Sequence, residues 1–187
     1  MNKIRLIFNN ATEISSNAEI GLLSLTDISK KRQLSIVCER NMAVEIEKRK
    51  SNKQLCSSLI AEVLTLMLKE HCVADYEIHI LDIVDGQYKV FVFNTDTLSS
   101  IPIRASDAVL LSMVADIPLF IEEKLMRMQS VEYNENKKGV TVPINAISVS
   151  MLEESLKKAI ETEDYEMASK LRDEINKRKR DMLNDMT

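Results

Sequence analysis

The hydrophobic pattern of this 187-residue chain changes once, close to residue 148, and that change limits the folds open to it. Before this point, short apolar runs follow one another with stretches of helical spacing between them. After it, apolar residues recur only at steps of three and four, as they do on one face of a helix. The pattern predicts an α+β fold: a mixed β-sheet with flanking helices, followed by an α-α hairpin.

The first part contains short runs typical of strands, at residues 4–8, 20–25, 34–38, 76–83, 88–93, 101–103 and 118–121. The polar stretch 26–32 predicts a hairpin turn. Asp85-Gly86 predicts a tighter one, because both residues adopt positive φ readily. Helices are expected near residues 42–46, 55–71, 108–114 and 122–128, the third with Ser106 as its N-cap.

The second part carries two apolar stripes that together predict the hairpin. Asp164 lies between them and is the expected N-cap of the second helix. The stripes consist of Leu152, Leu156, Ala159 and Ile160, and of Tyr165, Ala168, Leu171 and Ile175. We therefore expect a sheet domain at residues 1–133, a polar linker at 134–147 and the hairpin at 148–187.

Scarce residue types exclude several classes of enzyme. The three glycines lie far apart, so neither a P-loop nor a dinucleotide-binding loop can form. Two histidines cannot supply a three-histidine metal site. A net charge of −4 is unlike that of proteins that coat nucleic acid by bulk charge. Three cysteines without C-x-x-C spacing, and no signal peptide or membrane span, favour a soluble cytoplasmic protein.

One segment of the first part resembles the bifunctional nuclease family. It is similar to that family's R-x-S-D-A segment and the A-P-I-[FY] strand that follows. The matching residues are Arg104-Ala105-Ser106-Asp107-Ala108 and, after them, Ala115-Asp116-Ile117-Pro118-Leu119-Phe120. The resemblance covers roughly residues 4–131 and implies a nuclease that acts on DNA and RNA.

Phosphodiester hydrolysis suggests roles for three residues of this segment. Asp107 is a candidate ligand for Mg²⁺ or Mn²⁺, and Arg104 is a candidate clamp for a phosphate. Ser106 is a candidate hydrogen-bond donor. A structural alternative stays open, because Ser106 and Asp107 also suit the start of a helix and Arg104 can pair with Asp107.

Two departures from the family favour a second interpretation. The family's G-x-x-E-A turn is replaced here by Glu39-Arg40-Asn41-Met42-Ala43, and its L-T-H-D-L helix start by Leu55-Cys56-Ser57-Ser58-Leu59. A glycine, a glutamate, a histidine and an aspartate are therefore missing. The alternative is a catalytically degenerate scaffold that binds a protein partner.

The hairpin resembles the UVR motif of the excision-repair proteins UvrB and UvrC, over residues 156–175. That motif is known as a protein–protein interaction element, so the resemblance implies docking to a partner. The candidate docking residues are Tyr165, Ala168, Leu171, Arg172 and Ile175.

Two further expectations concern binding. Lys48, Arg49, Lys50 and Lys53 form a basic loop that is a candidate contact for a phosphate backbone, although such runs are often only solvated. Short strands leave exposed sheet edges, which favours a homo-oligomer.

Overall fold

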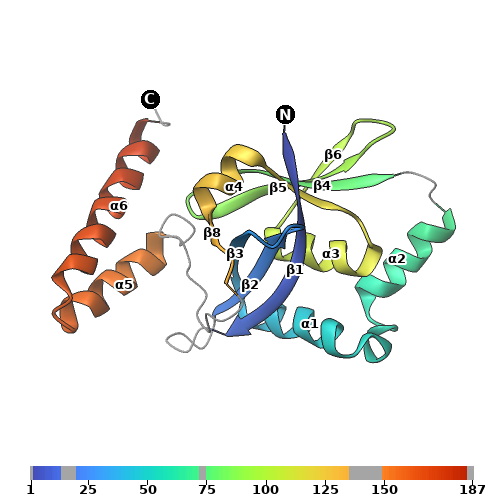
Figure 1. Ribbon diagram of the computed structural model, residues 1–187, viewed down its shortest axis with the longest axis horizontal. Helices are drawn as coiled ribbons and strands as arrows, with labels where there is room; N and C mark the ends of the chain where they lie inside the picture. Colours follow the sequence, from blue (N-terminus) through green and yellow to red (C-terminus); the bar gives the residue numbers. More distant parts are fainter. Residues whose placement is uncertain (1, 14–19, 72–74, 135–148, 185–187) are drawn as a thin grey trace.

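The computed structural model describes residues 2–13, 20–71, 75–134 and 149–184, and it confirms the α+β class (Figure 1). Eight strands form a single mixed sheet in the order β6-β5-β4-β7-β1-β2-β3-β8. The strands are β1 (Lys3–Glu13), β2 (Ile20–Asp27), β3 (Arg32–Glu39), β4 (Tyr76–Val84), β5 (Gln87–Asn94), β6 (Ser100–Ile103), β7 (Leu119–Glu122) and β8 (Ser130–Glu132).

Strand β7 joins two antiparallel groups of strands. One edge of β7 pairs antiparallel with β1, where Leu6 lies opposite Leu119. The other edge pairs parallel with β4, where Ile78 lies beside Leu119. All other pairings among the described strands are antiparallel, so β7 alone makes the sheet mixed.

Both hairpins expected from the sequence are present. Strands β2 and β3 pair in register, with Leu23 opposite Ile36. Asp85 and Gly86 have φ values of 48° and 72° and form the turn between β4 and β5. Positive φ at both central residues is the geometry that suits the twist of two adjacent strands.

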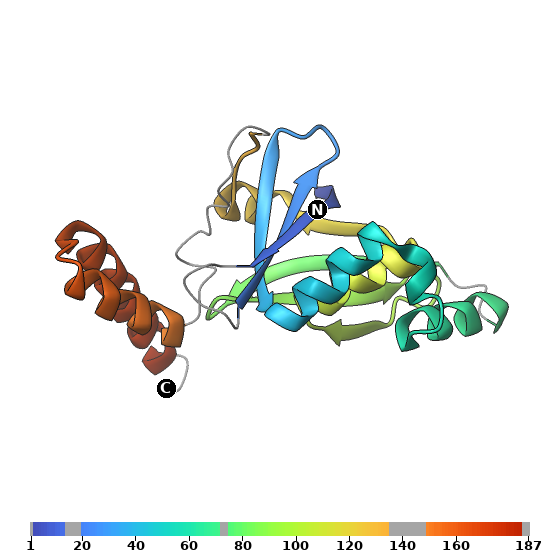
Figure 2. The same ribbon diagram turned by 90° about the horizontal axis from the view of Figure 1, so that it is seen from below.

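Three helices cover the sheet and close the core. They are α1 (Arg40–Ser51), α3 (Ala105–Ala115) and α4 (Glu123–Gln129) (Figures 1 and 2). Helix α1 packs on β1, β2 and β3, while α3 reaches both β3 and β5. The largest fully buried side chains of this core are Leu23, Leu25, Leu34, Ile36, Ile46, Ile78, Ile80, Val109, Ile121 and Met126. Each contributes about 1.5–3 kcal/mol by leaving water.

The sheet curves strongly around this core. The hydroxyl oxygen of Tyr88 in β5 lies 3.5 Å from the carbonyl oxygen of Ser35 in β3. Strands β4, β7, β1 and β2 separate these two strands in the sheet. The curvature therefore brings the end of β3 towards the residues that follow β5.

Two helix boundaries predicted from the sequence were wrong. The basic residues Lys48–Lys50 belong to the last turn of α1 and not to a loop. The next helix begins at Ile60, because Leu55 and Cys56 lie in a short 3-10 helix, η1 (Lys53–Cys56). Cys56 is only 1% exposed, so this turn anchors the connection between the helices in the core. Helix α2 (Ile60–His71) follows.

A short strand that the sequence did not predict follows α4. Ser130–Glu132 forms β8 on the edge of β3, where Ser130 lies opposite Leu34. The guanidinium of Arg32 donates to the hydroxyl of Ser130 at 2.6 Å and to its carbonyl at 2.8 Å. Polar residues suit this edge strand, whose outer side faces solvent. Residues 135–147 of the predicted linker lie outside the described part of the chain.

The C-terminal helices α5 (Val149–Glu161) and α6 (Tyr165–Asn184) pack against each other as expected. The Asp164 carboxylate accepts from the backbone N–H of Met167 at 3.0 Å and caps α6. Figures 1 and 2 place this hairpin at the opposite end of the molecule from α2. No helix in the described residues is long and apolar enough to cross a membrane.

The close packing of α1 on β2 yields a test of the fold. A Cβ atom at Gly21 would lie 2.5 Å from the Cβ of Ala43. We expect Gly21→Ala to lower the free energy of unfolding by about 1–3 kcal/mol, because α1 must move away from the sheet. Urea denaturation measures this change.

The variant Gly21→Ala/Ala43→Gly is the matched control. It restores space at the contact, so its destabilisation should be smaller than the sum of the two single changes. Additive effects would show that the contact does not limit the packing of α1.

Candidate functional site

Arg104 and Asp107 meet where β6 ends and α3 begins. The Nε of Arg104 donates to one carboxylate oxygen of Asp107 at 2.6 Å, and a terminal nitrogen donates to the other at 3.3 Å. This two-point pairing holds both planar groups in one orientation. It also raises the pKa of Arg104 above its ordinary value, so the guanidinium stays charged.

Ser106 is not the N-cap that the sequence predicted. Arg104 occupies that position with an extended backbone, and no side chain caps the helix there. Ser106 is the second residue of α3 and lines a pocket beside Arg104. Arg104 and Asp107 are three residues apart, so their ion pair spans the first turn of α3. This pairing is the structural alternative that the sequence predicted.

Glu39 completes this corner, which we call the Arg104 corner (Arg104, Ser106, Asp107 and Glu39). A carboxylate oxygen of Glu39 lies 3.4 Å from a terminal nitrogen of Arg104. Glu39 ends β3 and directly precedes α1, so α1 and α3 both begin at this corner. The N-termini of the two helices favour an anion here, and the Glu39 carboxylate is one such anion.

A pocket of about 290 Å³ adjoins the Arg104 corner. Met42 and Tyr88 contribute to its wall, and so does Cys38. Burial raises the pKa of the Cys38 thiol to about 11. The thiol is therefore protonated at neutral pH and is a poor nucleophile.

The donor groups at this corner do not fit a resident metal ion. Both oxygens of Asp107 accept from Arg104. Among the described residues, no three histidine, cysteine, aspartate or glutamate side chains come together as a ligand group. The Asp107 and Glu39 carboxylates that do lie at this corner both already contact Arg104.

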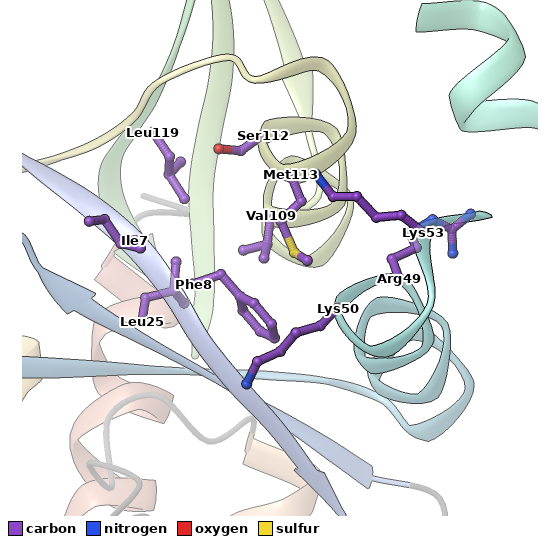
Figure 3. Close-up of a pocket in the computed structure, with 10 residues that line it drawn as sticks. All are labelled: Ile7, Phe8, Leu25, Arg49, Lys50, Lys53, Val109, Ser112, Met113 and Leu119. Atoms are coloured by element: carbon purple, nitrogen blue, oxygen red, sulfur yellow. The ribbon is translucent and has the colours of Figure 1, made fainter. Parts of the chain in front are cut away.

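Arg49, Lys50 and Lys53 lie around a different pocket, shown in Figure 3. Lys50 donates to the carbonyl of Asn9 at 2.6 Å, and Lys53 lies on the rim. Phe8 and Leu25 contribute to an apolar floor. Its lining includes Ser112 and Met113 in the C-terminal half of α3, and Ser112 lies about 10 Å along the helix from its start. The structure therefore does not bring these lysines to the Arg104 corner.

The side chain of Arg49 is buried in the protein interior. Its side chain is 7% exposed and pairs with Glu62 at 2.7 Å and with Glu45 at 2.8 Å. Burial alone would lower the pKa of Arg49, but hydrogen bonds to Glu62 and Glu45 raise it above its ordinary value. Figure 3 shows the guanidinium turned away from Phe8. Lys48 is exposed and lies 3.9 Å from Glu45.

The candidate docking residues of the hairpin divide into two groups. Ala168, Leu171 and Ile175 are buried in the hairpin's own core. Tyr165 is 68% exposed, and the side chain of Arg172 is also exposed. The hairpin also touches the sheet domain, because Arg178 lies 3.5 Å from Asp85 in the β4–β5 turn.

An aromatic cluster that was not predicted from the sequence lies on the outer face of the sheet. The His79 ring lies 4.9 Å from that of Phe93 and 5.6 Å from that of Phe120. Hydrogen bonds from Lys3 and His79 hold the pKa of Glu77 below its ordinary value. These residues come from β1, β4, β5 and β7, so only the strand order could reveal the cluster.

Comparison with known proteins gives two matches along the chain. The sequence model of the bifunctional nuclease domain matches residues 23–134, which is more than half of the chain. That of the UvrB/uvrC motif matches residues 148–184. No curated protein matches the sequence.

The buried position of Arg49 yields a prediction. We expect Glu62→Ala to lower the free energy of unfolding by about 1–3 kcal/mol, because it leaves a buried guanidinium short of a partner. Glu70→Ala, on the same helix but exposed, is the control and should change stability little. Thermal or urea unfolding measures both, and equal stability of the two variants would contradict a structural role for Arg49.

Proposed function

Because the chain belongs to the bifunctional nuclease domain family, we propose that its sheet domain cleaves phosphodiester bonds of DNA or RNA at the Arg104 corner. The observation that carries this proposal is the convergence of Arg104 and Asp107 beside an open pocket. The Arg104 side chain is 66% exposed, so a phosphate can reach it.

In this proposal each residue has a distinct role. Arg104 binds the scissile phosphate and stabilises its developing negative charge, which a planar guanidinium does well. Asp107 positions Arg104 through the two-point pairing. Ser106 lines the adjoining pocket and donates a hydrogen bond to the bound phosphodiester. Lys48, Lys50 and Lys53 contact more distant phosphates, whereas the buried Arg49 is not available for this.

A requirement for Mg²⁺ or Mn²⁺, with Asp107 as a ligand, stays a prediction. The donors described at the Arg104 corner do not form a ligand set, and we assign no step to a metal. Comparison of activity with each ion and with a chelator tests the requirement directly.

The nuclease proposal predicts that Arg104→Gln loses activity by about 100- to 1,000-fold, because a charged phosphate contact disappears. Arg127→Gln is the matched control. Arg127 is also exposed and also pairs with a carboxylate nearby, that of Glu123, but it lies in α4 away from the corner. Cleavage of labelled single-stranded DNA and RNA, with Mg²⁺ or Mn²⁺, provides the measurement.

Two results would contradict this proposal. One is full activity in Arg104→Gln at unchanged stability. The other is the absence of cleavage by the wild-type protein with either ion.

A second candidate function is that of an adaptor without catalysis. Glu39 favours this alternative. It stands at the position where the family's turn has a glycine, and its carboxylate lies 3.4 Å from the guanidinium of Arg104. The docking surface would be the turn of the hairpin, where Ile160, Tyr165 and Met167 are 54%, 68% and 43% exposed. Tyr165 and Arg172 are seven residues apart and so lie on one side of α6. With Ile160 at the turn, they offer an apolar patch with a cationic neighbour, which suits a protein partner.

The adaptor proposal predicts that Ile160→Ser/Tyr165→Ser loses a defined set of bound proteins in quantitative affinity capture. Lys170→Ser is the control, because Lys170 is exposed on the same helix but pairs with Glu166 outside the patch. Identical sets of bound proteins for wild type and the patch variant would count against docking through this turn.

A further inference from the structure

The pocket between α1 and α3, shown in Figure 3, has a volume of about 350 Å³ and a mostly apolar lining. Leu25, Val109 and Leu119 line it from the core and are only 0%, 1% and 2% exposed. Phe8 and Met113 also contribute to its walls. Sites for small molecules commonly have this size, an apolar interior and a few polar groups at defined positions.

The polar side chains that line the interior already have partners within the protein. The Ser112 hydroxyl donates to the carbonyl of Ile117 at 2.7 Å. The Arg49 guanidinium pairs with Glu45 and Glu62. Among the described residues, the lining therefore offers few hydrogen-bond partners to a guest, and a polar group buried without a partner is unfavourable. A hydrocarbon chain fits such walls better than a nucleobase, whose edges carry donors and acceptors.

The rim of the pocket carries positive charge. Lys53 is exposed, and no carboxylate in the described part of the chain pairs with its ammonium group. Figure 3 shows this side chain extended across the pocket towards Met113. Lys50 differs, because its ammonium group donates to the carbonyl of Asn9 at 2.6 Å and lies 5.9 Å from the centre of the Phe8 ring. Lys53 is therefore the cation that an anionic guest can reach.

We propose that this pocket binds a medium-chain carboxylate. Its hydrocarbon chain lies against Leu25, Val109 and Met113, and its carboxylate pairs with Lys53. A methylene group occupies the volume of a water molecule, ~30 Å³, so the pocket has room for a chain of about ten carbons. A single ammonium group complements the single charge of a carboxylate, whereas a phosphate dianion is better served by several donors.

The proposed site is separate from the Arg104 corner. The pocket beside Arg104 and Ser106 shares no lining residue with this one. Binding of a carboxylate here is therefore independent of phosphodiester cleavage, and either proposal can fail while the other stands.

Isothermal titration calorimetry of the full chain with carboxylates of increasing length tests the proposal. We expect affinity to rise about three- to fourfold for each methylene from hexanoate to decanoate, because each methylene leaves water. Affinity should then level off for longer chains, whose additional carbons stay in solvent.

The variant Lys53→Gln tests the role of the rim. It should weaken decanoate binding about three- to tenfold, because a charge-assisted contact is lost, and leave the binding of uncharged decanol unchanged. Lys48→Gln is the matched control. Lys48 is also exposed and lies in the last turn of α1, but it does not line the pocket.

Methyl resonances of ¹³C-labelled methionine locate the bound chain independently. Decanoate should shift the Met113 resonance, which the variant Met113→Leu assigns. Met67 is 52% exposed on α2 and reports adventitious binding to exposed apolar surface, so its resonance should not shift.

Three results would overturn the proposal: no binding of decanoate, equal decanoate affinity in wild type and Lys53→Gln, or shifts confined to Met67. Thymidine monophosphate that shifts the Met113 resonance where decanoate does not would assign the pocket to a nucleotide instead.

Discussion

The short strand β7 holds the two halves of the sheet together. It contributes only four residues, yet β1 pairs with one edge and β4 with the other. Leu119 and Ile121 point from it into the core, where they are 2% and 1% exposed. Without these pairings no backbone hydrogen bonds of the sheet would join the meander β6-β5-β4 to the strands β1-β2-β3-β8. The meeting of Glu39 at the end of β3 with Arg104 at the end of β6 depends on this link and on the curvature of the sheet.

Charge placement explains much of the remaining architecture. Arg49 has the exposure of a core residue, and its two carboxylate partners come from α1 and α2. A buried guanidinium needs such partners, so α2 must present Glu62 inwards. The apolar stripe of α2 is then turned to solvent. One buried ion pair thus decides which side of α2 faces its own domain.

Residue spacing predicted much of the local structure. The Asp85-Gly86 turn, the β2–β3 hairpin and the Asp164 cap depend on neighbours in sequence, and all three were predicted correctly. The pairing of Arg104 with Asp107 is equally local, and the sequence predicted it as the structural alternative to a catalytic role. Ser106 was misassigned because serine suits several positions in a first turn, and only the backbone of Arg104 shows which residue is the cap. Strand β8 was missed because its polar residues resemble those of a linker.

By itself, the sequence determined the α+β class, the α-α hairpin and the resemblance to the bifunctional nuclease family, because these rest on periodicity and on contiguous motifs. The tertiary structure decided which distant groups meet. Glu39 contacts Arg104, and Arg49 is buried between Glu45 and Glu62. Ala168, Leu171 and Ile175 pack in the core of the hairpin. The tertiary structure also turned the apolar side of α2 outwards. Helical spacing shows that a helix has an apolar side, but the direction of that side depends on contacts between segments far apart in the chain.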